Sequence, residues 1–195
     1  MNSELSEEAR NFLAHTVAES MEGYELRDPQ LRMMDACAGT IDAGGTLVAE
    51  AGTGTGKTFA YLVPIILSGQ KAIVSTRTIN LQEQLASKDL KLLSALKDLD
   101  YAVAKGRSNF LCLRRLHAFH PDNTEESAEH KNMLDWAADT ASGDREDCRN
   151  YKSPLIWDKV CADSDACKGK KCSHFKNCYY FLARQKWEAA SIVVT

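Results

Sequence analysis

The sequence predicts an α/β protein with a parallel sheet. A glycine-rich loop, Glu50 to Thr58, lies between an apolar, β-branched run at 46–50 and a helical apolar pattern from Lys57 to Leu67. Strand-like and helix-like stretches alternate as far as about residue 104, as they do in β-α-β units. The chain has 195 residues, 44% of them hydrophobic, and is long enough to bury one substantial core.

The expected elements alternate along the chain. Asp28 is a good helix cap, and Pro29 suits the first helical position, where its missing N–H costs nothing. Pro64 should kink the helix that follows the loop, or end it early. The residues Ser191–Thr195 are strand-like and indicate a return to the sheet. In order, we expect helices at 4–21 and 29–43, a strand at 46–50, a helix at 57–67, a strand at 71–75, a helix at 78–99 and strands at 101–104 and 191–195.

The loop has the residue types that bind triphosphates. Its glycines let backbone amides turn toward an anion without a side chain in the way, and the helix that follows presents its positive end. Lys57 would reach the β- and γ-phosphates and the Thr58 hydroxyl would bind Mg²⁺, so these two are the candidate catalytic residues. The loop residues expected to bind ATP are Ala51, Gly52, Thr53, Gly54, Thr55, Gly56, Lys57 and Thr58.

Charge and hydrophobicity exclude several classes of protein. A net charge of −3 gives no global attraction to nucleic acids, so any such surface must be local. The first ten residues are polar and acidic, and no run approaches the roughly 20 apolar residues that span a bilayer. We expect a cytoplasmic protein with no membrane partner, in which the seven cysteines are reduced thiols.

The cysteine spacing indicates a metal centre. Three close thiolates and one distant thiolate are often found around iron–sulfur clusters, whereas zinc sites usually pair cysteines two to four residues apart, twice over. From the spacing alone, zinc and unliganded core thiols remain alternatives, and Cys148 or Cys161 could take the place of one ligand. The four candidate ligands are Cys112, Cys167, Cys172 and Cys178.

Basic and aromatic residues are interleaved around the late cysteines. Between Cys167 and Trp187 the chain holds six basic residues, no acidic residue and five aromatic residues. Pairing phosphate neutralisation with base stacking is typical of sites that bind single strands without sequence preference. The alternative is that the lysines are merely solvated and the aromatic rings pack in the core.

Together these motifs resemble the XPD/DinG iron–sulfur DNA helicases, and the bacterial DinG/YoaA branch is the most similar. The resemblance covers about residues 24–195 and implies a RecA-like P-loop NTPase domain interrupted by a small, mostly helical iron–sulfur domain. The implied boundaries are 1–104 and 188–195 for the first motor domain and 105–187 for the insert. The motifs that carry it are Glu50–Thr58 continuing to Pro64, Ser75–Thr78 with Leu81–Leu85, Lys105–Cys112, and the late cysteines.

The resemblance also implies roles for individual residues and the cofactors ATP, Mg²⁺ and a 4Fe–4S cluster. Arg27 and Gln30 match the segment that contacts adenine, or are ordinary helix-start residues. Thr78 could contact DNA and also cap its helix. The four cysteines named above match the cluster ligands. The implied DNA contacts are Ser75, Thr76, Arg77, Thr78, Arg107, Lys168, Lys170, Lys171 and Lys176.

The activity implied is that of an ATP-dependent 5′-to-3′ helicase acting on single-stranded or forked DNA in repair or replication. The DEAH box and second motor domain of the family do not occur in these 195 residues, so we expect an N-terminal fragment that lacks ATP turnover. Two other classes remain open. One is a non-enzymatic module that binds DNA or a protein partner, and the other is a small P-loop enzyme, such as a kinase, with a structural zinc site.

Overall fold

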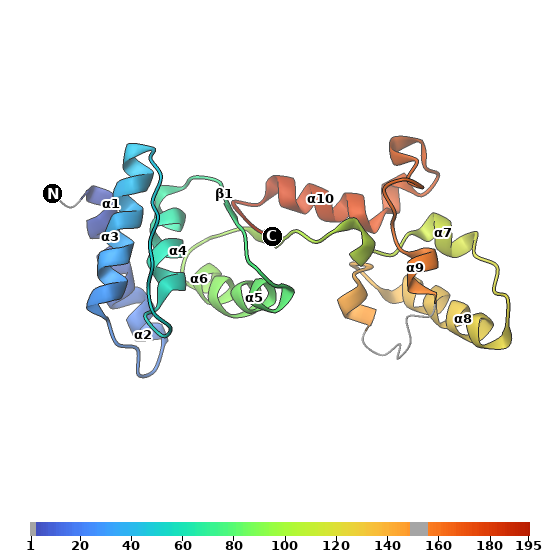
Figure 1. Ribbon diagram of the computed structural model, residues 1–195, viewed down its shortest axis with the longest axis horizontal. Coiled ribbons are helices and arrows are strands. Elements are labelled where there is room, and N and C mark those ends of the chain that lie inside the picture. Colours follow the sequence, from blue (N-terminus) through green and yellow to red (C-terminus); the bar gives the residue numbers. More distant parts are fainter. Residues whose placement is uncertain (1–2, 149–155) are drawn as a thin grey trace. The chain divides into compact units, whose positions relative to one another are not determined.

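The computed structural model describes residues 3–148 and 156–195, and the chain divides into two units (Figure 1). Unit 1 consists of Met1–Val103 and Ala190–Thr195, and unit 2 of Ala104–Ala189. No helix among the described residues is long and apolar enough to cross a membrane.

Unit 1 begins with a group of helices. The side chain of Ser3 caps the first helix by accepting a hydrogen bond from the amide of Ser6. Arg27, and not Asp28, is the N-terminal cap residue of the helix α3, because Arg27 has an extended backbone whereas Asp28 already lies in the first turn. These helices are α1 (Glu4–Asn11), the π-helical η1 (Phe12–Val17), α2 (Ala18–Ser20), α3 (Asp28–Ala43) and α4 (Lys57–Ser68).

The helix α4 runs through Pro64 to Ser68, so of the two expected effects of this proline, a kink or an early end, the early end is wrong. Pro64 is buried, as are its neighbours Leu62 and Val63, and this packing offsets the hydrogen bond that proline cannot donate. The positive φ of Gly69, 67°, ends the helix instead.

A parallel three-stranded sheet completes unit 1. The strands β1 (Ala72–Val74), β2 (Tyr101–Val103) and β3 (Ile192–Val194) are arranged in the order β1-β3-β2. The predicted return of the chain to the sheet is confirmed, and the returning strand takes the central position. In the register of the sheet, Ile192 lies opposite both Ala72 and Tyr101.

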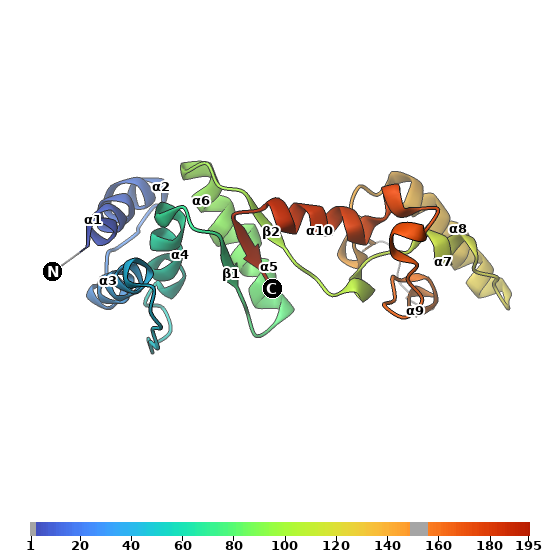
Figure 2. The ribbon, with the colours of Figure 1, turned by 90° about the horizontal axis from the view of Figure 1, so that it is seen from above.

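Helices cover one face of this sheet (Figure 2). Between β1 and β2 the chain forms α5 (Ile79–Gln84), the π-helical η2 (Leu85–Leu90) and α6 (Lys91–Leu96). Ile192 and Val194 pack with Leu90 and Leu93 in the core, whereas Ile73, which points to the other face, is 73% exposed. The predicted α/β class with a parallel sheet is therefore confirmed.

The prediction of a strand at 46–50 is wrong. These residues have no regular secondary structure, and Val48 is 94% exposed. An apolar, β-branched run becomes a strand only where a neighbouring strand satisfies its backbone hydrogen bonds. The three strands that the described residues form pair with one another, and none of them adjoins this run.

Unit 2 is mostly helical. Its core includes Leu111, Leu116, Ile156 and Val160, together with the buried Trp136 and Trp157. Two isolated antiparallel bridges, Phe110 with Asp144 and Leu111 with Cys161, join distant parts of the chain. The α-helices are α7 (Leu113–His117), α8 (Thr124–Asp139), α9 (Trp157–Val160) and α10 (Tyr179–Ala189), and the 3₁₀ turns are η3 (Arg107–Asn109), η4 (Arg145–Cys148), η5 (Gly169–Lys171) and η6 (Phe175–Asn177).

Candidate functional site

The glycine-rich loop ends at the start of α4. Gly54 and Gly56 both have a φ of 76°, in the left-handed region that favours glycine, and Gly56 is the cap residue of the helix. Lys57 and Thr58 therefore lie in the first turn of a 12-residue helix, whose free amides and dipole attract anions. This is the backbone arrangement that a triphosphate site requires.

Lys57 closes the loop on itself. Its Nζ donates hydrogen bonds of 2.9 Å to the carbonyl oxygen of Ala51 and 2.6 Å to that of Gly52. The hydroxyl of Thr55 donates to the same Gly52 oxygen at 3.0 Å. The ammonium group is thus held against two carbonyl oxygens of the loop. Thr53 is exposed, and Thr58 is half-buried beside Lys57.

The structure brings Arg27 and Gln30 to the loop from the start of α3. Arg27 donates to the carbonyl oxygen of Gly54, and Nε2 of Gln30 donates to that of Gly56 at 3.0 Å. Gln30 is only 2% exposed. These two residues therefore support the glycine-rich loop directly.

Tyr24 is a residue of this region that the sequence motifs did not single out. Its hydroxyl donates to Oε1 of Gln30 at 3.0 Å, and its ring meets that of Phe59 edge to face. Burial raises the pKa of Tyr24, and the contacts with Gln30 and Arg27 offset this only in part. The neutral hydroxyl therefore keeps its proton and orients the amide of Gln30. Only the three-dimensional contact identifies this residue.

Ser75–Thr78 follows β1 at the carboxyl edge of the sheet. The amide of Thr76 donates to the carbonyl oxygen of Thr195 at 2.8 Å, and the Thr78 side chain accepts from the amide of Leu81, capping α5. Ser75, Arg77 and Thr78 are exposed. Buried Gln82, also missed from the sequence, donates to the carbonyl oxygen of Val194 at 3.1 Å and fixes the end of β3 against this segment.

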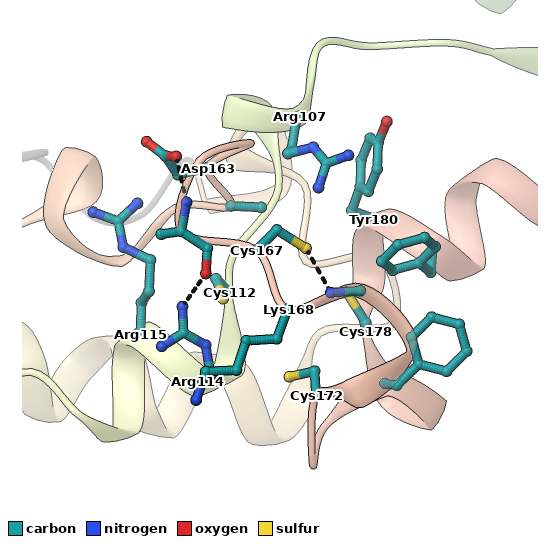
Figure 3. A pocket seen from close by; sticks show the side chains of 15 residues that line it. Arg107, Cys112, Arg114, Arg115, Asp163, Cys167, Lys168, Cys172, Cys178 and Tyr180 are labelled. Carbon is teal, nitrogen blue, oxygen red and sulfur yellow. Dashed lines mark hydrogen bonds between the residues drawn. The ribbon is translucent and has the colours of Figure 1, made fainter.

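In unit 2 the four candidate ligand cysteines line one pocket (Figure 3). Cys112 reaches it from the segment before α7, and the other three come from the turns between Ala162 and α10. Cationic side chains also line the pocket, Asp163 is the one acidic residue among the described residues of the lining, and aromatic rings close another side. The cationic residues are Arg107, Arg114, Arg115 and Lys168, and the aromatic ones are Phe175, Tyr180 and Phe181.

The thiols of this pocket lie close enough to influence one another electrostatically. Burial is the largest cause that raises the pKa of Cys178, amides of Phe181 and Tyr180 oppose it, and nearby Cys112 and Cys167 raise it further. The amide of Gly169 lies 3.4 Å from Sγ of Cys167, in position to donate to a thiolate. A set of four thiols beside amides and cations favours bound iron or zinc over inert core cysteines.

Among the described residues, 3–148 and 156–195, no group of three or more histidine, cysteine or acidic side chains could hold a single metal ion. Thiolates around an iron–sulfur cluster bind different iron atoms and therefore stand farther apart than the ligands of one ion.

Cys148 and Cys161 do not line the pocket. Both are buried in the hydrophobic core of unit 2, and Sγ of Cys148 lies 3.9 Å from Sδ of Met133. Burial, with a contribution from Glu129, raises the pKa of Cys148 to about 11. The geometry therefore gives no support to either residue as a substitute ligand. Cys37 lies on α3 in unit 1, half-buried, where burial raises its pKa.

The candidate DNA contacts of unit 2 surround the same pocket. Arg107 lies 4.3 Å above the ring of Tyr180, and this ring also packs against Phe110 and Trp187. Most of the aromatic residues thus contact one another, as the alternative of core packing predicts. The lysines are exposed at the pocket or on the adjoining 3₁₀ turns, and they are Lys168, Lys170, Lys171 and Lys176.

Comparison with known proteins finds relatives that are named as helicases. A family model described as DEAD/DEAH box helicase matches residues 28–121. The chain is 37% identical over 187 residues to a protein named ATP-dependent DNA helicase YoaA from Escherichia coli K12, a match that covers 91% of this chain and 29% of YoaA.

Two other relatives carry the name DinG. The chain is 33% identical over 201 residues to the ATP-dependent helicase DinG of Mycobacterium tuberculosis H37Rv, covering 89% of this chain and 30% of the relative. It is 32% identical over 191 residues to a Bacillus subtilis protein named 3′-5′ exonuclease DinG, covering 92% and 20%. The chain thus spans less than a third of the length of these relatives.

Proposed function

Because the chain belongs to the DEAD/DEAH box helicases and is a relative of YoaA and DinG, we propose that it forms the ATP-binding part of an ATP-dependent DNA helicase with a 4Fe–4S cluster. The observation that carries the proposal is the pocket shared by four cysteines, in a chain that also has a supported phosphate-binding loop. Movement in the 5′-to-3′ direction and a role in repair or replication follow from the family resemblance.

The proposed nucleotide site is the loop 51–58. Its amides and the first turn of α4 would bind the phosphates, Lys57 would leave the carbonyl oxygens of Ala51 and Gly52 for the β- and γ-phosphates, and Thr58 would bind Mg²⁺. Catalysis of phosphoryl transfer is mainly positioning and charge stabilisation. The contacts of Arg27 and Gln30 with the loop carbonyls serve this positioning.

The four pocket cysteines are the proposed cluster ligands. Once bound, a 4Fe–4S cluster supplies a rigid multi-iron cross-link and a one-electron redox centre. Cys112 is separated in sequence from the other three, so ligation would tie two distant segments of unit 2 together. Arginine and lysine side chains line the same pocket, and their positive charge would offset the negative charge of ligated thiolates.

The proposed DNA partner is single-stranded or forked DNA. In unit 2, exposed lysines lie beside the partly exposed rings of Phe175 and Phe181, which is the combination that binds a flexible strand. In unit 1, the exposed side chains of Ser75, Arg77 and Thr78 are suited to backbone phosphates.

Nucleotide binding tests the proposal in this chain. Fluorescently labelled ATP should bind in the presence of Mg²⁺, and Lys57→Ala should abolish the binding. Lys91→Ala, which removes an exposed lysine of α6, should leave it unchanged. Equal loss in both variants would show that general charge, and not the loop, attracts the nucleotide.

Hydrolysis in a protein of the length of the relatives separates the helicase from its alternatives. ATP hydrolysis stimulated by single-stranded DNA supports the helicase. Phosphoryl transfer to a small acceptor without such stimulation would identify a kinase. DNA binding without ATP hydrolysis at that length would identify a non-enzymatic module.

A further inference from the structure

The pocket depends on how two distant segments of unit 2 are joined. The amide of Cys112 donates to the carbonyl oxygen of Val160 at 2.9 Å, and the amide of Ala162 donates to that of Phe110 at 2.7 Å. These bonds belong to the antiparallel bridge between Leu111 and Cys161. The bridge fixes Cys112 well but ends at Ala162, five residues before Cys167.

The turn that follows is held by Asp163. Its Oδ1 accepts hydrogen bonds from the amides of Asp165 at 2.7 Å and Ala166 at 3.1 Å. This is the local side-chain turn that aspartate and asparagine favour, because a short side chain reaches the backbone two and three residues on. It folds the chain back toward the pocket just ahead of Cys167.

The end of the same turn is held by Arg114. Nη2 of Arg114 donates at 2.6 Å to the carbonyl oxygen of Ala166, the residue directly before Cys167 (Figure 3). Arg114 itself follows Cys112 by two residues and lies in the first turn of α7. One guanidinium therefore joins the immediate neighbourhoods of two candidate ligands that are far apart in sequence.

A second arginine holds the beginning of the segment. Arg115 donates to the carbonyl oxygens of Cys161 at 2.6 Å and Asp158 at 2.9 Å, where α9 ends. It stabilises the bridge, which backbone bonds already support. The contacts of Asp163 and Arg114 differ, because they act on the part of the chain that lies beyond the bridge.

We propose that Arg114 and Asp163 are positioning residues that hold the thiol of Cys167 opposite Cys112 and so form the pocket before any metal enters. The biological meaning of this inference rests on the proposed iron–sulfur function, but the geometry that it describes needs no metal. A preformed site binds more tightly because the cost of ordering its ligands has already been met in folding.

The direct test measures the proximity of the two thiols in metal-free protein. The test uses a variant that retains only Cys112 and Cys167, with alanine at 148 and 161 and serine at 37, 172 and 178. The reagent is dibromobimane, which becomes fluorescent only when it has bridged two thiols. Arg114→Met and Asp163→Ala should each slow the bridging by about tenfold, which corresponds to losing one or two such hydrogen bonds. A reagent that reacts with single thiols corrects for changes in their reactivity.

Two matched variants separate positioning from general damage. Asp163→Asn keeps the side-chain oxygen that accepts from Asp165 and Ala166, so it should bridge at the parent rate. Arg184→Met removes an exposed arginine whose partner is Glu188, on the same helix, and should also have no effect. All three tryptophans lie in unit 2, so their fluorescence shows whether each variant folds.

A second measurement follows the metal in protein with all seven cysteines. After anaerobic reconstitution, Arg114→Met and Asp163→Ala should lose visible absorbance to an iron chelator about tenfold faster than wild type, whereas Asp163→Asn should not. Absence of iron from wild type would refute the cluster proposal alone, because the bridging rates still decide the positioning. Unchanged bridging in Arg114→Met and Asp163→Ala would overturn the inference even where the cluster is present.

Discussion

Gln30 donates a 3.0 Å hydrogen bond from Nε2 to the carbonyl oxygen of Gly56, the cap residue of α4. The approach is so close that a Cβ atom added at Gly56 would lie 2.2 Å from Nε2. The glycine at this position therefore does two things. It adopts a left-handed backbone, and it leaves room for the buried amide that supports the loop.

The first prediction is that Gly56→Ala weakens nucleotide binding more than strain alone explains. Gly69→Ala is the matched control, because Gly69 has a similar φ of 67° but nothing within 4 Å of an added Cβ. Both variants should lose about 1–2 kcal/mol of stability from the left-handed backbone. Only Gly56→Ala should also displace Gln30 and reduce the affinity for labelled ATP. Equal affinities would show that the contact with Gln30 is dispensable.

The second prediction concerns the metal centre. Anaerobically prepared protein should be brown and carry about four iron atoms per chain. Cys167→Ser should remove the colour, whereas Cys37→Ser, in unit 1, should keep it. Metal analysis and visible absorption measure both. Colourless wild-type protein with stoichiometric zinc would contradict the cluster.

The third prediction is that single-stranded DNA binds near the pocket despite the net charge of −3. The logarithm of affinity should fall with the logarithm of salt concentration, by about 0.7 per phosphate contact. Replacing Lys168, Lys170 and Lys171 with alanine should flatten this slope.

Two observations control the third prediction. Lys131→Ala, at an exposed position of α8, should leave the slope unchanged. The lysine substitutions should also leave the iron content unchanged. A slope that resists the triple substitution would point to Ser75–Thr78 as the main DNA contact.

The fourth prediction concerns acid stability. Burial alone would raise the pKa of Asp35, but hydrogen bonds from Arg10 and Ser6 outweigh it and hold the pKa below the ordinary value of 3.8. A lowered carboxyl pKa stabilises the fold above pH 3.8, and this contribution is lost as the pH falls from there through the folded pKa. Asp35→Asn should therefore lower the free energy of unfolding by up to about 1 kcal/mol near pH 7. The effect is small because the side chains of Arg10 and Asp35 are both partly exposed.

Amide hydrogen exchange in α1 and α3 measures this effect in unit 1. Tryptophan fluorescence is not suitable, because all three tryptophans lie in unit 2. The difference between wild type and Asp35→Asn should shrink below pH 3.8. Asp42→Asn, at an exposed position of α3, should match wild type at every pH. A difference that persists in acid would mean that the hydrogen bonds do not depend on the charge of Asp35.

Local pattern was sufficient for most of the elements. The helices from Glu4 and Pro29, the strands near Ile73 and Ala102, and the returning strand at 191–195 were all predicted, because their hydrophobic periodicity reflects the core they face. The family was likewise identified from ordered motifs. The run at 46–50 failed because β-branched composition favours a strand but cannot supply the neighbour whose hydrogen bonds complete it.

The sequence by itself determined the chemistry that is available: a loop whose glycines and lysine suit phosphates, and cysteines whose spacing suits a metal. The tertiary structure decided which of these groups meet. It placed Cys112 at a pocket with Cys167, Cys172 and Cys178, and withdrew Cys148 and Cys161 into the core. It also brought Tyr24 to Gln30 and Arg114 to Ala166. Such contacts join residues whose local patterns are independent, so only the packing of the whole chain fixes them.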